Sequence, residues 1–108
     1  MRIAKIYSHK IYAGVLTEHD DGFYTFRYEY QYFTDIKYDA ISLTLPKTEQ
    51  EYRAQTLFPF FSNILSEGTN RKIQSRMFKL DEEDDFGLLL ATANADTIGA
   101  ITVEKIDV

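Results

Sequence analysis

The alternation of side chains across residues 23–32 constrains the fold of this chain most strongly. An aromatic residue stands at every second position, which gives the series Tyr24, Phe26, Tyr28, Tyr30 and Tyr32. Successive side chains of a β-strand point to opposite faces of a sheet, so the series predicts a strand with one aromatic face, at least as far as Tyr28. Asp20-Asp21-Gly22 precedes it and is typical of a hairpin turn, because Asp and Gly tolerate a positive φ.

Such an aromatic face can either stack on nucleic acid or sugar, or pack against a protein core. The chain has 12 Lys and Arg residues against 17 Asp and Glu, with a net charge of −5. Binding to nucleic acid needs a basic surface, which this balance opposes. With 108 residues, the chain also needs its aromatic side chains to build a core. We therefore expect a packed sheet face and no direct contact with nucleic acid.

The other expected strands come from shorter alternating runs, at Arg2–Tyr7, Ile11–Thr17, Ile41–Leu45 and Ala100–Val108. Ser8-His9-Lys10 is expected to form the first turn. Gly14 lies inside the second strand, where glycine marks a bulge or a close approach of another backbone. Pro46 ends the strand at Leu45, because proline has no N–H to donate.

The apolar spacing changes to a helical period after residue 55. It predicts helices over Thr56–Leu65, with Thr56 as N-cap and Pro59 in the first turn, and over Thr69–Phe78. A third helix is expected to begin at Asp81 as N-cap. The expected fold is therefore α+β: one domain, 1–108, in which about three short helices pack on a curved antiparallel sheet or partial barrel. Its expected core is Ile3, Ile6, Val15, Phe26, Leu43, Leu45, Phe60, Phe61, Leu65, Met77, Leu88, Leu89 and Ile101.

Composition excludes several kinds of chemistry. The chain has no cysteine, so disulfides, thiolate metal sites and cysteine nucleophiles are ruled out. No apolar run is long enough for a signal peptide or for the roughly 20 residues of a membrane span. We expect a cytoplasmic protein with no metal, no cofactor and no membrane contact.

The residues also indicate no catalytic site. Asp85-Phe86-Gly87 spells the magnesium motif of protein kinases, but the other kinase motifs are absent from the sequence. His9 and His19 fall near expected turns, and no spacing ties a nucleophile or carboxylate to either. We expect no enzymatic activity.

Thr56–Leu65 and Thr69–Phe78 together have the outline of a helix-turn-helix, with basic residues on the second helix. That basic side is explained equally by a solvated surface or by contact with an acidic protein partner. We favour these two explanations over binding to DNA.

Four motifs in order resemble the N-terminal subdomain of the HipA family of serine/threonine kinase toxins. They are Ile41–Pro46 (ISLTLP), Pro59–Gly68 (PFFSNILSEG), Asp84–Leu89 (DDFGLL) and Asp96–Ala100 (DTIGA). In that family the subdomain precedes a kinase core that holds the nucleotide and catalytic residues. The chain ends at Val108, so the resemblance is to the part without catalytic residues.

The resemblance implies a function. The chain is similar to the small stand-alone antitoxin of three-component HipBST systems, which binds and neutralises a HipA-like kinase that lacks this subdomain. A separate helix-turn-helix protein of those systems contacts DNA and is a further expected partner.

The expected kinase contact is the turn between the expected helices Thr56–Leu65 and Thr69–Phe78. Its residues are Asn63, Ser66, Glu67, Gly68, Thr69, Asn70 and Arg71. It is polar and lies between helices with apolar anchors, which is a common arrangement for a binding loop. Two alternatives stay open. One is a structural or regulatory subdomain, or a fragment of a HipA kinase, that contacts a DNA-binding partner without inhibiting the kinase. The other is a small ligand-binding module or enzyme that uses either the aromatic strand or His9 and His19.

Overall fold

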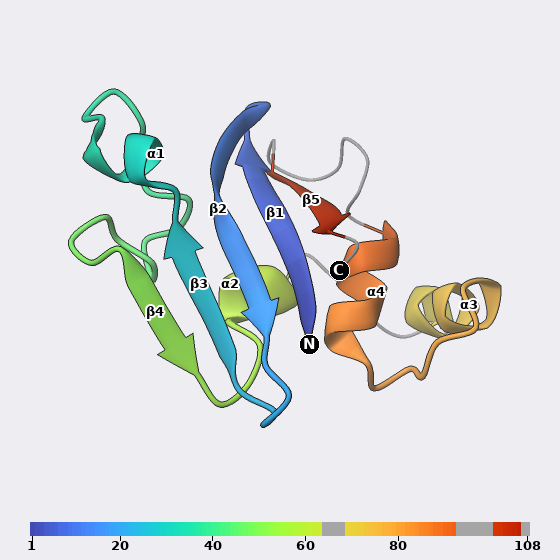
Figure 1. Ribbon diagram of the computed structural model, residues 1–108. Helices are drawn as coiled ribbons and strands as arrows, with labels where there is room; N and C mark the ends of the chain where they lie inside the picture. The colour runs from blue at the N-terminus through green and yellow to red at the C-terminus, as the bar shows by residue number, and fades with distance from the viewer. Residues whose placement is uncertain (64–68, 93–100, 107–108) are drawn as a thin grey trace.

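The computed structural model describes residues 1–63, 69–92 and 101–106. Their strands form one antiparallel five-stranded sheet with the order β4-β3-β2-β1-β5, which is open and not closed into a barrel (Figure 1). The strands are β1 (Arg2–Ser8), β2 (Ile11–Glu18), β3 (Tyr24–Tyr28), β4 (Glu51–Ala54) and β5 (Ile101–Ile106). The helices are α1 (Tyr30–Thr34), α2 (Pro59–Ser62), α3 (Thr69–Met77) and α4 (Asp85–Thr92). The expected α+β class is confirmed.

The last strand of the sheet returns to the first. β5 pairs with β1, so that Ile6 lies opposite Val103. β1 and β2 form one hairpin, and β2 and β3 form the next, with Leu16 opposite Phe26. The N-terminal strand therefore lies between β2 and β5, and the edge of the sheet beside it is formed by a strand from the other end of the chain.

One face of the sheet carries the core. Phe61 of α2 packs against Phe26, with ring centroids 5.8 Å apart, and Phe86 of α4 stacks on Tyr24 at 6.0 Å. Helices α2 and α4 contact each other, and α2 lies behind the sheet in Figure 1. Of the expected core, Ile6, Phe26, Leu45, Phe61, Leu88, Leu89 and Ile101 are buried. The aromatic strand face is therefore packed, as expected.

The hairpin of β1 and β2 contains a bulge. Ile6 lies opposite Gly14, whereas Tyr7 lies opposite Tyr12, so Ala13 is the additional residue. A Cβ on Gly14 would lie 2.4 Å from the carbonyl oxygen of Arg27 in β3. The expectation that Gly14 marks a bulge or close backbone contact is confirmed, and both features occur there.

His9 and Lys10 form a two-residue loop between these strands, with φ of 50° and 68°. This left-handed conformation suits the twist of a hairpin but costs a residue with a Cβ about 1 kcal/mol or more. We predict that Lys10→Gly stabilises the protein by about 0.5–1 kcal/mol in urea unfolding. Lys10→Ala is the control, because it removes the same side chain and keeps the conformational cost. Equal stability of the two variants would contradict the prediction.

The expected strand at Ile41–Leu45 is wrong. The segment forms a turn in which the Ser42 hydroxyl accepts a hydrogen bond from the backbone N–H of Thr44, at 3.2 Å. Its ends are held by one side chain, since the Tyr28 hydroxyl donates to the Leu45 carbonyl and accepts from the Ile41 N–H. Leu43 was expected in the core but is 99% exposed.

The fourth strand lies further along the chain. β4 occupies Glu51–Ala54, in a polar stretch whose sequence indicates no clear structure. In the described sheet it is an edge strand paired with β3, and its residues alternate between exposed and half-buried positions.

The helices differ from the expected ones in three places: α1 is an additional helix, and α2 and α4 begin later than expected. The aromatic strand ends at Tyr28, and Glu29 caps α1 by accepting from the Gln31 N–H, so Tyr30 and Tyr32 belong to a helix. Helix α2 begins at Pro59 after Phe58, not after Thr56, and ends at Ser62. In the described residues of this part, α2 has four residues and α3 has nine, whereas the outline of a helix-turn-helix was expected from Thr56–Leu65 and Thr69–Phe78.

Helix α4 begins later than expected. Asp84 is its N-cap, because the Asp84 carboxylate accepts from the Gly87 N–H at 3.0 Å. Asp81 instead accepts from the Glu83 N–H and stabilises the preceding turn. Met77 was also expected in the core but is 68% exposed. Leu65, which was expected there too, lies outside the described residues.

Candidate partner-binding site

The expected contact turn is described at its two ends. Asn63 follows α2, is exposed, and its N–H donates to the Pro59 carbonyl at 2.9 Å. Thr69 and Asn70 begin α3, and Arg71 follows them. Ser66, Glu67 and Gly68 lie outside the described residues.

The N-terminal end of the turn is anchored by aromatic packing. Phe61 is fully buried and contacts Phe26, Phe58 and Phe60. Pro59 at the first position fixes the start of this short helix, because its ring sets φ near the helical value. Asn63 therefore follows a short helix that Phe61 anchors to the sheet.

The C-terminal end is anchored by a charge. The Arg71 guanidinium donates to the Glu82 carbonyl at 2.8 Å and forms an ion pair with Asp85 at the first turn of α4. Arg71 therefore holds α3 against the start of α4. Within the described residues, the Arg71 guanidinium is engaged by these two contacts. In a complex with a partner, Arg71 would therefore act by positioning α3.

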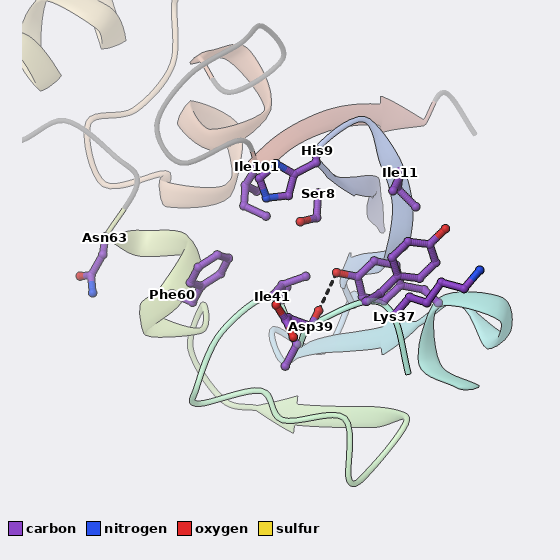
Figure 2. Close-up of a pocket in the computed structure, with 12 residues that line it drawn as sticks. Ser8, His9, Ile11, Lys37, Asp39, Ile41, Phe60, Asn63 and Ile101 are labelled. Carbon is purple, nitrogen blue, oxygen red and sulfur yellow. Dashed lines mark hydrogen bonds between the residues drawn. The ribbon is translucent and has the colours of Figure 1, made fainter. Parts of the chain in front are cut away.

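A cavity of about 570 Å³ lies beside Asn63. Figure 2 shows it between Phe60 of α2, Ile101 of β5, and Ser8 and His9 of the first hairpin. Stacked rings form its other wall, since Tyr32 and Tyr38 have centroids 5.0 Å apart in nearly parallel planes. The Tyr32 hydroxyl donates to the Asp39 carbonyl at 2.6 Å.

This cavity tests the arrangement expected for a ligand-binding module. It joins His9 with Tyr32 of the aromatic series, but His19 lies elsewhere. The His19 ring stacks on Phe23 at 4.2 Å and hydrogen-bonds the Thr25 hydroxyl at 2.9 Å. Across residues 1–63, 69–92 and 101–106, no three His, Asp or Glu side chains are close enough to hold a metal ion.

A charged network fixes α4 to the sheet, and sequence reasoning missed it. Arg2 of β1 pairs with Glu18 of β2 at 2.7 Å and with Asp84 at 2.8 Å. The Arg2 guanidinium also lies over the Phe86 ring, 5.2 Å from its centroid. Arg2 and Asp84 are 82 positions apart, and no local pattern could indicate that they meet.

This network predicts loss of stability in acid. Arg2 holds the pKa of both Glu18 and Asp84 below their ordinary values of 4.5 and 3.8. A lowered pKa in the folded state contributes stability that is complete above the unfolded value and is lost as the pH falls through the folded value. We predict that the free energy of unfolding decreases below about pH 5.

Arg2→Met is the variant that checks this, since it removes the charge and keeps a long unbranched side chain beside Phe86. It should cost about 1 kcal/mol at pH 7, because the network is partly open to solvent. Its deficit relative to the wild type should shrink as the pH falls to about 3. A deficit that is constant across this range, in urea unfolding at each pH, would show that the carboxylates are not stabilised by Arg2.

No helix among the described residues is long and apolar enough to cross a membrane.

Comparison with known proteins identifies the fold. The family model described as "HipA N-terminal domain" matches residues 4–104. A solved structure described as "N-terminal domain of HipA toxin" superimposes with a TM-score of 0.74 and 25% sequence identity, covering 99% of this chain and 94% of that one. An uncharacterized protein of Haemophilus influenzae is 26% identical over 105 residues, which are 97% of this chain and 93% of the relative.

The family match covers the four described helices, β4 and most of β5, and it includes the four motifs that suggested the resemblance. The chain therefore belongs to the HipA N-terminal domain family.

Proposed function

We propose that this chain is a non-enzymatic antitoxin that binds and neutralises a HipA-like serine/threonine kinase lacking this subdomain. The observation that carries the proposal is the family match over residues 4–104, because it covers the HipA subdomain that precedes the kinase core. The Haemophilus influenzae relative is of nearly the same length, since the alignment spans 93% of it. On this proposal the protein acts in the cytoplasm, by covering a surface of its kinase.

The expected contact is the turn from Asn63 to Arg71. Its support is the way its ends are held: Phe61 buries α2 against the sheet, and Arg71 joins α3 to α4. A loop between fixed ends loses less conformational entropy on binding than a free one. A small helix-turn-helix DNA-binding protein is a further partner in the same complex.

The first experiment is co-expression with a HipA-type kinase that lacks its own N-terminal subdomain and is encoded in the same genome. We expect the wild type to restore growth and to co-purify with the kinase. The triple variant Ser66→Ala, Glu67→Ala, Thr69→Ala should lose both effects. A matched triple, Lys37→Ala, Glu49→Ala, Glu51→Ala, changes the same number of polar residues at the α1–β4 end and should behave as the wild type.

The outcomes separate the proposals. If the turn variant binds and protects like the wild type, the turn is not the contact. Co-purification without restored growth would instead support an architectural role, in which the subdomain completes the kinase or contacts the DNA-binding partner. If the wild type neither binds nor protects, the antitoxin proposal is wrong.

A further inference from the structure

Helix α3 carries two parallel rows of exposed side chains. Ile73 and Met77 are 47% and 68% exposed, although both are apolar. Lys72 and Arg76 stand beside them and are also exposed. Residues four apart lie on the same side of a helix, so an apolar row runs next to a basic row. Single exposed apolar residues are ordinary, but neighbouring ones on a helix indicate a surface that another molecule covers.

A C-terminal cap and the contacts of Arg71 orient the helix. Lys79, with φ of 55°, ends it in a left-handed cap, in which the Leu80 N–H donates to the Ser75 carbonyl at 2.8 Å and the Lys79 N–H donates to the Arg76 carbonyl. The buried Ser75 and the Arg71 contacts hold the opposite side. Figure 1 shows α3 on the side of α4 that faces away from the sheet. The two rows therefore face solvent, on the side of α3 away from the Arg71 contacts.

A small cavity extends the apolar row. It has a volume of about 270 Å³ and lies between Phe78, Leu80 and Leu90, with Lys105 at its border. Phe78 follows Met77 directly and is 44% exposed. Ile73, Met77 and Phe78 thus lead along α3 to an apolar cavity able to receive a side chain of a partner.

The charges of this region indicate the kind of partner. Residues 71–79 contain four of the 12 Lys and Arg residues and no acid, in a chain whose net charge is −5. Among the described residues, the recorded ion pairs do not include Lys72, Arg76 or Lys79. Uncompensated cations around apolar side chains are complementary to a surface with acidic side chains around an apolar patch.

An acidic stretch adjoins the basic row. Asp81, Glu82, Glu83 and Asp84 lie between α3 and α4, and Asp85 begins α4. A phosphate backbone or an anionic lipid surface would be repelled by it, and would leave Ile73 and Met77 against charged groups. A protein surface can match both signs of charge and the apolar row.

We propose that α3 is a second docking surface for the kinase, and that it binds an apolar patch of the kinase bordered by Asp and Glu side chains. This inference rests on the proposed function, and it places part of the binding energy outside the turn from Asn63 to Arg71. Apolar contact supplies affinity at the row, and the cations supply orientation and speed of association.

The test measures the affinity of the purified protein for the kinase by calorimetry. The variants are Ile73→Glu with Met77→Glu, and Lys72→Glu with Arg76→Glu. We expect each pair to weaken binding by about ten-fold or more, and wild-type binding to weaken at about 0.5 M salt. The matched control is Ile36→Glu with Leu43→Glu, since these side chains are 96% and 99% exposed in the α1–β4 connection. It should change the affinity by about two-fold at most.

Circular dichroism and thermal unfolding check that each variant is folded, which is expected because the replaced side chains are exposed. Wild-type affinity in both α3 variants would overturn the inference and leave the antitoxin proposal intact. Failure of the wild type itself to bind the kinase would overturn both. One further result would overturn the inference. In it, the wild type binds anionic vesicles or duplex DNA, and the Lys72→Glu, Arg76→Glu variant loses that binding while its affinity for the kinase is unchanged.

Discussion

Replacing Gly14 with alanine is expected to destabilise the protein by about 3 kcal/mol or more. The new Cβ would lie 2.4 Å from the Arg27 carbonyl oxygen and 2.9 Å from the Phe26 ring. The Arg27 oxygen belongs to the backbone of β3, and β2 and β3 are paired at Gly14–Tyr28 and Val15–Arg27. Relief of the clash therefore requires the two strands to separate, which breaks the ladder and moves Phe26 out of the core.

Gly22→Ala is the control for this prediction. Gly22 has φ of +90°, but nothing lies within 4 Å of the added Cβ, so only the conformational cost of about 1 kcal/mol applies. Urea unfolding gives the free energy of unfolding of both variants. The loss at Gly14 reports the clash of the new Cβ, and the loss at Gly22 reports the strained backbone. Equal losses in the two variants would contradict the close contact at Gly14.

Phe61→Ala is expected to cost about 3–5 kcal/mol, the range for removing a buried aromatic ring. Phe61 is fully buried and contacts Phe26 of the sheet and the two phenylalanines of its own segment, Phe58 and Phe60. Helix α2 spans only Pro59–Ser62, so it has few other contacts to keep it in place. Loss of the ring should release α2 and with it the first end of the expected kinase contact.

Phe60→Ala is the matched change at the neighbouring position. Phe60 is half-buried and lines the cavity of Figure 2, so its loss should cost clearly less. Thermal unfolding ranks the two variants, and kinase affinity should fall with Phe61→Ala at a temperature where the variant is still folded. A smaller loss for Phe61 than for Phe60 would contradict the packing described for α2.

The sequence predicts the local elements of this fold better than its long-range contacts. The hairpins follow from alternation and turn residues, and the Gly14 contact follows from a glycine within a strand. Ile41–Leu45 alternates like a strand, yet the Tyr28 hydroxyl takes the hydrogen bonds that a neighbouring strand would otherwise supply. Helix α1 spans only Tyr30–Thr34, which is too short to show a helical period.

The candidate site was only partly predictable, for a related reason. An apolar period in a helix is the same whether the helix faces its own core or a partner, so Met77 was expected to be buried although it is 68% exposed. The Lys and Arg residues of α3 can be counted in the sequence. Their exposure cannot, because it depends on Arg71, whose ion pair turns the opposite side of the helix toward α4. The Arg2 network joins β1 to α4, and such pairs have no local signature.

The most direct test of the account is the rate of substrate phosphorylation by the purified kinase as this protein is added. The kinase is the HipA-type enzyme of the same genome that lacks its own N-terminal subdomain. We predict that the rate falls toward zero with increasing concentration of the protein, and that Ile73→Glu with Met77→Glu shifts this inhibition to higher concentrations. An unchanged rate at saturating protein, in a mixture where the complex is shown to form, would contradict the proposed antitoxin function.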